Sequence, residues 1–168
     1  MMRALFKQAR PKQWLKNVLV FAAVGAAGKL HHWPYLWRTI VMFVAFSLAA
    51  SGTYYWNDIL DVEDDRRHPE KRRRPIASGA IPMPLARIVG SSLLIVGVAL
   101  PIVVWRWQAV VAVAVYVALT LAYSLQLRRL AVFDLVAVAG GFVLRAIGGA
   151  EGTAVYMSKW FLLCTMFG

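Results

Sequence analysis

A row of carboxylates between Asp58 and Asp65 is the part of this sequence best suited to chemistry. Five of the chain's eight acidic residues fall within these eight positions, after an apolar stretch and before a basic one. At about 100° of rotation per residue, Asp58, Asp61 and Asp65 share an arc of roughly 60° on one helix face. Asn57 widens this arc to about 100°, whereas Glu63 points to the opposite side.

Such a row of hard oxygens is typical of a Mg²⁺ site. The row rises by about 10 Å along a helix at 1.5 Å per residue. Mg²⁺ favours a few carboxylates together with phosphate oxygens over a closed cage of protein ligands. The alternative is a solvated helix end whose acids pair with nearby Arg and Lys. The sequence predicts three catalytic aspartates and, with one asparagine, a metal-binding set: Asn57, Asp58, Asp61 and Asp65.

A cationic loop follows the acidic row. Residues 66–79 hold six Arg or Lys side chains, two prolines and a final glycine. Pro69 disfavours helix at the residue before it, so the helix that carries the acids should stop at His68. Arg binds phosphate with two parallel hydrogen bonds and Lys binds it as a point charge, and we name Lys71 and Arg74 as the best phosphate ligands. Carboxylates beside cations predict a diphosphate site; the alternative is that these cations only set topology or contact anionic lipid.

The composition places these residues in a membrane protein. The chain has 168 residues, of which 60% are hydrophobic, and a mean hydropathy of +0.60, yet its formal net charge is +11. A soluble domain does not combine so apolar a body with so many cations, whereas a multispan membrane protein gathers charge in its loops. A single cysteine, Cys164, excludes an intramolecular disulfide and a Cys-based metal site. We expect no nucleic-acid partner.

Five apolar segments have the length of membrane helices, which need about 20 mostly apolar residues. They cover residues 14–30, 36–57, 85–105, 107–127 and 130–150, and a sixth begins near Ser158. The stretch from Ser158 to Gly168 holds only 11 residues, so the sixth helix is expected to be truncated. We therefore expect residues 1–168 to be one integral membrane domain, the N-terminal part of a longer fold, and inactive when alone.

The basic residues predict the orientation of these helices. Fourteen of the 19 Lys and Arg lie before the first span or in the loops after the second and fourth, and four lie on the other side. Because cytoplasmic loops carry this excess, the N-terminus, the acidic row and the loop of Arg128 should face the cytoplasm from the plasma (inner) membrane. Arg145 lies within a span, where a charge usually faces an interior cavity. Two roles of Arg145 are left open: an ion pair with Glu151, or contact with the substrate.

These motifs together resemble the UbiA superfamily of intramembrane prenyltransferases. The resemblance rests on Asn-Asp-x-x-Asp-x-x-x-Asp at 57–65 and Arg-Pro-Ile-Ala-Ser-Gly at 74–79. The insert at 68–71, together with segments 10–17, 123–125 and 141–147, makes the chain most similar to the decaprenyl-phosphate phosphoribosyltransferases of that superfamily. The resemblance extends from about Arg10 to Gly168.

The resemblance implies an all-α, polytopic membrane bundle of the UbiA type, of which this chain would hold about five complete membrane helices and a truncated sixth. It implies a Mg²⁺-dependent transfer of 5-phosphoribose from phosphoribosyl pyrophosphate to polyprenyl (decaprenyl) phosphate, with release of pyrophosphate, for cell-wall arabinan precursor synthesis. A second acidic motif would lie beyond Gly168. Leu127 stands where many relatives have a lysine, and the nearest cation is Arg128. A homo-oligomer is left open.

Further substrate ligands are expected at two helix ends. Arg10, Lys16 and Asn17 lie at the cytoplasmic start of the first span and are candidates to close the site. Tyr123 and Ser124 lie at the end of the fourth span, where an interfacial tyrosine is the ordinary alternative. The predicted substrate-binding residues are therefore Arg10, Lys16, Asn17, Lys71, Arg74, Tyr123, Ser124, Arg128 and Arg145.

Two other functions remain open from the sequence. One is a UbiA-type prenyltransferase that acts on an aromatic or quinone precursor. The other is a non-catalytic membrane protein, such as an anion transporter or lipid-binding subunit, or an inactive fragment. A transporter more naturally shows charges and broken helices near the membrane midplane. Here the charges gather at one face, which favours chemistry accessible from that face.

Overall fold

The computed structural model describes residues 1–125 and 131–156, and for residues 131–136 only the backbone. The described residues form helices and turns without any strand, which confirms the predicted all-α class. In chain order the elements are α1 (Met2–Gln8), η1 (Pro11–Phe21), α2 (Ala22–Ala26), α3 (Trp33–Leu60), α4 (Val62–Arg67), η2 (Lys71–Arg73), α5 (Met83–Ala99), η3 (Leu100–Val104), α6 (Trp107–Leu125) and α7 (Ala131–Thr153).

Four of the predicted spans coincide with long helices. Three helical stretches are long and apolar enough to cross a membrane, at Trp33–Leu60, Met83–Val104 and Trp107–Leu125. They match the predictions 36–57, 85–105 and 107–127, and α7 occupies the predicted fifth span. The predicted sixth span, from Ser158, lies outside the described residues. The chain is therefore a membrane protein with an all-helical body.

The first predicted span, residues 14–30, is wrong in its limits and in its helix type. The chain forms the 3-10 helix η1 from Pro11 and then the short α2, which ends at Ala26. At about 2.0 Å per residue in a 3-10 helix and 1.5 Å in an α-helix, the two segments extend roughly 30 Å, close to the thickness of the hydrocarbon core. A count of apolar residues does not reveal this stretched geometry.

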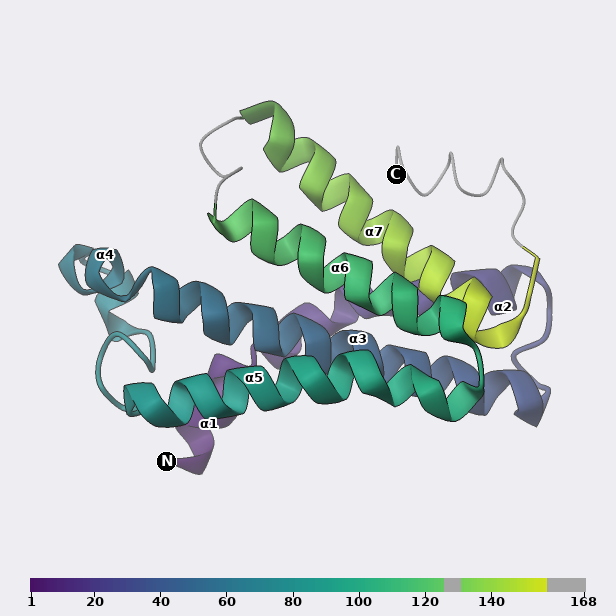
Figure 1. Cartoon of the computed structure of the whole chain (residues 1–168), viewed down its shortest axis with the longest axis horizontal. Coiled ribbons are helices and arrows are strands. Elements are labelled where there is room, and N and C mark those ends of the chain that lie inside the picture. Colours follow the sequence, from purple (N-terminus) through teal and green to yellow (C-terminus); the bar gives the residue numbers. More distant parts are fainter. Residues whose placement is uncertain (126–130, 157–168) are drawn as a thin grey trace.

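Helix α3 lies at the centre of the bundle. It packs against α5, while α6 packs against α7, and η1 contacts both α3 and α7 (Figure 1). The core where these elements meet holds Met42 and Phe46 of α3, Val113 and Tyr116 of α6, and Val20 of η1. Membrane helices associate through such close packing. α4 and the turns after it lie together at one end of the bundle (Figure 1).

A small residue sets the distance between α3 and α5. A Cβ atom on Gly97 of α5 would lie 2.7 Å from the backbone N of Ala49 in α3. A glycine is therefore needed for the two backbones to approach this closely, as is common between membrane helices. The rigid pair that results carries the acidic row at the end of α3.

Candidate active site

The helix that carries the acidic row is interrupted at Asp61. α3 ends at Leu60, Asp61 has φ −89° and ψ 6°, and α4 starts after it. The prediction of one continuous helix through the row is therefore wrong at Asp61, although Asp58 and Asp65 still lie on the same side of the chain, where both contact Arg74. These two aspartates are only 1% and 2% exposed. Asp61 and Asn57 are half-buried.

Two other predictions around the acidic row are confirmed, the outward position of Glu63 and the helix end before Pro69. Glu63 is exposed and pairs with Arg66 of its own helix at 3.1 Å, away from the two buried aspartates. α4 ends at Arg67, and His68 is extended, as expected for the residue before Pro69. The Nδ1 atom of His68 accepts the backbone N–H of Glu70 at 3.2 Å, so His68 helps to turn the chain into the cationic loop.

The two buried aspartates are joined by one arginine. Arg74 Nη1 donates hydrogen bonds to Asp58 Oδ1 at 3.1 Å and to Asp65 Oδ2 at 2.8 Å. Arg10 Nη2 donates to both oxygens of Asp58, at 2.8 and 3.0 Å. Gln8 Nε2 donates to Asp58 Oδ2 at 2.8 Å. Asp58 thus accepts four hydrogen bonds, the number that its lone pairs allow.

These five residues, Gln8, Arg10, Asp58, Asp65 and Arg74, form what we call the Asp58 cluster. A cavity of about 380 Å³ opens beside it, which we call the basic cavity. Lys71, a predicted phosphate ligand, is not among its lining residues, whereas Arg73 is. The lining carries a formal net charge of +2, from four cations and two carboxylates: Lys7, Arg10, Arg73, Arg74, Asp58 and Glu70.

Two buried carboxylates beside this cavity are of the ligand type that a divalent cation favours. Asp58 and Asp65 offer hard carboxylate oxygens, with Asn57 and Asp61 nearby in sequence. Arg74 places positive charge between the two buried carboxylates, which shows that a cation is stabilised there. Within residues 1–125 and 131–156, however, no three acidic, His or Cys side chains gather in a group able to hold a metal ion.

A second polar site surrounds Arg145, which is 7% exposed. Its Nε donates to Asn17 Oδ1 at 2.7 Å, its Nη2 to the Tyr116 hydroxyl at 3.0 Å, and its Nη1 to the carbonyl of Gly141 at 2.7 Å. The suggested pair with Glu151 does not form, because Glu151 contacts Arg106 at 3.4 Å instead. Among the described side chains, Arg145 has no carboxylate partner.

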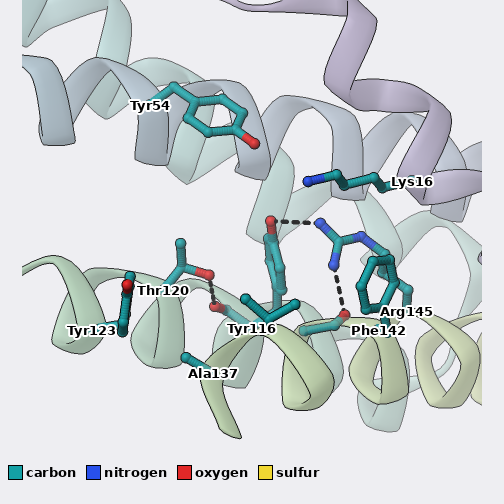
Figure 2. A pocket seen from close by; sticks show the side chains of 10 residues that line it. Lys16, Tyr54, Tyr116, Thr120, Tyr123, Ala137, Phe142 and Arg145 are labelled. Carbon is teal, nitrogen blue, oxygen red and sulfur yellow. Dashed lines mark hydrogen bonds between the residues drawn. The ribbon is translucent and has the colours of Figure 1, made fainter. Parts of the chain in front are cut away.

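Arg145 lines a cavity of about 210 Å³ between α3, α6, α7 and η1, which we call the tyrosine cavity. Figure 2 shows the amino group of Lys16 and the hydroxyl of Tyr54 reaching toward the space in front of the Tyr116 hydroxyl, where the Arg145 guanidinium also lies. Tyr123 lines the same cavity. Tyr54 and Tyr116 were not predicted from the sequence, although each carries a hydroxyl group inside an apolar span.

Arg10 and Tyr54 stand between the two cavities. The Arg10 guanidinium carbon lies 4.7 Å from the centre of the Tyr54 ring. Arg10 lines the basic cavity and Tyr54 lines the tyrosine cavity. Arg10 also has a left-handed backbone, with φ 51° and ψ 59°, a strained conformation for a side chain of this size and one that is often found at functional sites. The two side chains therefore form the boundary between the cavities, which we call the Arg10–Tyr54 wall. The cation–π contact and the hydrogen bonds of Arg10 to Asp58 hold it in place.

A polar stripe on α3 holds the N-terminal segment in place. Asn17 Nδ2 donates to Ser47 at 2.9 Å, Trp14 Nε1 to Ser51 at 3.0 Å, and the Tyr55 hydroxyl to the carbonyl of Leu5 at 2.9 Å. Positions 47, 51, 55 and 58 follow helical spacing, so this stripe is a sequence signal that was missed. Asn17 is fully buried and links Arg145 to α3, so it orients that arginine.

Ser124, another predicted substrate ligand, does not line either cavity. Ser124 Oγ donates to the carbonyl of Thr120 in its own helix, at 3.0 Å. Arg128 lies outside the described residues.

The fold described above is that of a polytopic all-α membrane protein. Residues 18–168 match the UbiA prenyltransferase family, and the chain belongs to this family. It is 42% identical to the decaprenyl-phosphate phosphoribosyltransferase of Mycolicibacterium smegmatis, over 98% of this chain and 52% of that protein. It is 40% identical to the protein of the same name from Corynebacterium glutamicum, over 98% of this chain and 50% of the relative.

The solved structures agree on the fold. A UbiA homologue from Archaeoglobus fulgidus, bound to DMAPP and Mg²⁺, superposes with a TM-score of 0.79 at 18% identity, over 97% of this chain and 59% of that chain. At this identity the likeness concerns the fold alone. The chain spans about half the length of the curated relatives it matches.

Proposed function

We propose that this chain forms the substrate-binding core of an enzyme that transfers 5-phosphoribose from phosphoribosyl pyrophosphate to a polyprenyl phosphate, with release of pyrophosphate. The observation that carries the proposal is the presence of two cation-lined cavities that meet at the Arg10–Tyr54 wall. A transfer between two phosphate-bearing substrates needs two anion sites side by side. The names of the relatives at 40–42% identity support the same reaction.

The basic cavity suits the phosphoribosyl donor. Its four cations exceed its two carboxylates, and three of the cations are arginines, which bind phosphate with two parallel hydrogen bonds. Phosphoribosyl pyrophosphate carries a 5-phosphate besides its diphosphate, so it needs more cationic contacts than a prenyl diphosphate. Lys7 and Arg73 are free to contribute these contacts without breaking the bonds of the Asp58 cluster.

We infer that the enzyme uses Mg²⁺. Asp58 and Asp65, with Asn57 and Asp61, would hold the ion. When bound, the ion would neutralise charge on the departing pyrophosphate. Arg10 and Arg74 would then exchange part of their contact with the carboxylates for contact with the donor phosphates, because each guanidinium lies on the wall of the basic cavity. The Mg²⁺-bound homologue of the same fold supports this inference.

The tyrosine cavity suits the phosphate of the lipid acceptor. It offers two cations, Lys16 and Arg145, and no carboxylate among its lining residues. In the described part of the chain, the groups that accept hydrogen bonds from Arg145 are all neutral, so its charge is available to an anion. A phosphate monoester has its second pKa near about 6 and is already anionic at neutral pH, so it needs no general base.

The reaction then requires little beyond positioning. An oxygen of the polyprenyl phosphate forms a bond to the anomeric carbon of ribose while the bond from that carbon to pyrophosphate breaks. Positive charge develops on the ribose, and the leaving pyrophosphate takes the electron pair. Cations aimed at the leaving group stabilise this charge separation. Because the Arg10–Tyr54 pair separates the cavities, its side chains must move for the two substrates to meet.

The test uses a chimera in which this chain replaces the matching half of the Mycolicibacterium smegmatis relative. Membranes with the chimera receive Mg²⁺, decaprenyl phosphate and phosphoribosyl pyrophosphate labelled in the ribose. We expect the label to enter the organic phase as phosphoribosylated lipid. The intact relative is the positive control. Prenylation of 4-hydroxybenzoate from a prenyl diphosphate, without ribose transfer, would identify the chain as an aromatic prenyltransferase instead.

A further inference from the structure

Gln8 has a buried oxygen that no described residue satisfies. Its side chain is at the end of α1 and is 1% exposed. Nε2 donates to Asp58 Oδ2 at 2.8 Å, whereas Oε1 has no hydrogen-bond partner among the residues that the structure describes. The orientation of the amide follows from chemistry, because an ionised carboxylate only accepts hydrogen bonds and so must face the NH₂ group. The carbonyl end of Gln8 is thus left for another donor.

The Gln8 side chain that carries this oxygen is part of the wall of the basic cavity. Gln8 lines the cavity together with Lys7, Arg10, Asp58 and Arg73. A buried acceptor without a partner is costly, and such an atom in a native fold calls for an explanation. The phosphate groups of a ligand are acceptors and cannot satisfy it. A ligand that does so must bring an O–H or N–H donor in addition to its phosphates, and the ribose hydroxyls of phosphoribosyl pyrophosphate are such donors.

We propose that Gln8 Oε1 accepts a hydrogen bond from a ribose hydroxyl of the donor, and that Gln8 thereby selects a phosphorylated sugar over a prenyl diphosphate. The inference rests on the proposed function and adds the residue that sets donor choice. A prenyl diphosphate presents a similar diphosphate to Arg10 and Arg74, but its hydrocarbon chain has no hydroxyl to donate. A site built around a substrate hydroxyl discriminates strongly against an analogue that lacks it, because the protein acceptor is then buried unpaired.

The position of Gln8 also connects sugar recognition with the acidic residues. One amide group would contact the ribose through its oxygen and Asp58 through its nitrogen. A sugar bound this way would lie next to Asp58, with its diphosphate near Arg10 and Arg74. Gln8 comes from α1, 50 positions away from Asp58 in the sequence, so no local sequence motif predicts this contact.

The experiment measures ligand binding to the 168-residue chain in nanodiscs with Mg²⁺, by calorimetric titration. Gln8→Met keeps the length and neutral charge of the side chain but removes the hydrogen bond to Asp58 and the proposed one to the ribose. We expect it to raise the Kd for phosphoribosyl pyrophosphate about tenfold and to change the Kd for inorganic pyrophosphate by less than about twofold. The donor analogue without the two ribose hydroxyls should bind equally to both proteins. Gln108→Met, in the first turn of α6 and outside the lining of the basic cavity, is the matched control and should change the Kd of neither ligand.

Each other result has a defined meaning. Equal weakening of phosphoribosyl pyrophosphate and pyrophosphate overturns the proposal, because Gln8 then only orients Asp58 or a metal-bound water. No effect on either ligand also overturns it. If the unsubstituted chain binds pyrophosphate and geranyl diphosphate but not phosphoribosyl pyrophosphate, the proposed function itself fails. Retained pyrophosphate binding by the variant shows that it is folded.

Discussion

At the scale of single residues, Arg74 and Asp58 form the buried, hydrogen-bonded ion pairs on which this site depends. One nitrogen of Arg74 contacts two carboxylates that are almost fully buried, and Asp58 accepts all the hydrogen bonds it can. Removing one member of such a network leaves a buried charge unpaired, which costs more than losing an exposed ion pair. The pair of Glu63 and Arg66, in contrast, is exposed to solvent and contributes little.

This contrast gives a prediction for the acidic residues. In the chimera, Asp65→Asn should lower kcat/KM for ribose transfer at least about a hundredfold, or about 2.7 kcal/mol at 1.36 kcal/mol per tenfold. The reason is that the neutral amide no longer pairs with Arg74 and is a poor ligand for a divalent cation. Glu63→Gln, in the same helix, is the control and should stay within about twofold. Comparable losses for the two variants would mean that the buried pair is not the chemical centre.

At the scale of the elements, helix α3 holds the site together, because it contacts the N-terminal segment on one side and α5 on the other. The polar stripe on α3 binds the N-terminal segment at Ser47, Ser51 and Tyr55, and the same segment brings Arg10 to one cavity and Lys16 to the other. The opposite side of α3 packs closely on α5 through Gly97. A change that moves α3 therefore disturbs both cavities at once.

The α3–α5 contact is testable through its glycine. Gly97→Ala would place a Cβ atom 2.7 Å from the backbone N of Ala49, which no rotamer change can relieve. We expect it to destabilise the chain by about 1–3 kcal/mol, the usual cost of overpacking. Unfolding of the chain in mixed micelles by a denaturing detergent measures this free energy.

Gly140→Ala provides the control for this measurement. Its added Cβ would meet Leu119 Cδ2 at 3.1 Å, the end of a flexible side chain that can move away. The free energy of unfolding should change by less than about 0.5 kcal/mol, as for most tolerated substitutions. If both glycine variants unfolded alike, close approach of the α3 and α5 backbones would not be limiting.

The molecule as a whole is organised by charge along one axis. α4 and the cationic loop lie at one end of the bundle, and the basic residues that predict the orientation gather in the segments before α2 and after α3 (Figure 1). We propose that this end faces the cytoplasm, because cytoplasmic segments carry the excess of Lys and Arg. Phosphoribosyl pyrophosphate, a highly charged donor, would then enter the basic cavity from water on that side.

The orientation can be measured at Ser78, which is exposed in the cationic loop. After Cys164→Ala removes the native thiol, Ser78→Cys should react with a membrane-impermeant maleimide in inverted vesicles and stay unlabelled in intact cells. Cysteine at Lys29, between α2 and α3, is the control for the opposite face and should show the reverse. Labelling of the Ser78 position from outside intact cells would place the site on the other side of the membrane.

Composition and local pattern were enough to predict much of this protein. Long apolar runs allow only membrane helices, because every backbone group must be satisfied within its own segment. The acidic row beside a cationic loop, and the helix end at His68, follow from neighbouring residue types and from Pro69. These features depend on interactions within a few positions of the chain, and so the sequence carried them directly.

Tertiary packing was needed for the contacts that assemble the site. The helix break at Asp61 and the stretched helix η1 were not visible in the apolar pattern. Gln8 reaches Asp58 across 50 positions, and Arg145 reaches Asn17 across 128. Such pairs form because helices of fixed length pack at particular registers, and a one-dimensional pattern of residue types does not encode which polar groups then meet. Packing therefore gave Asp58 its three partners and Arg145 its cavity.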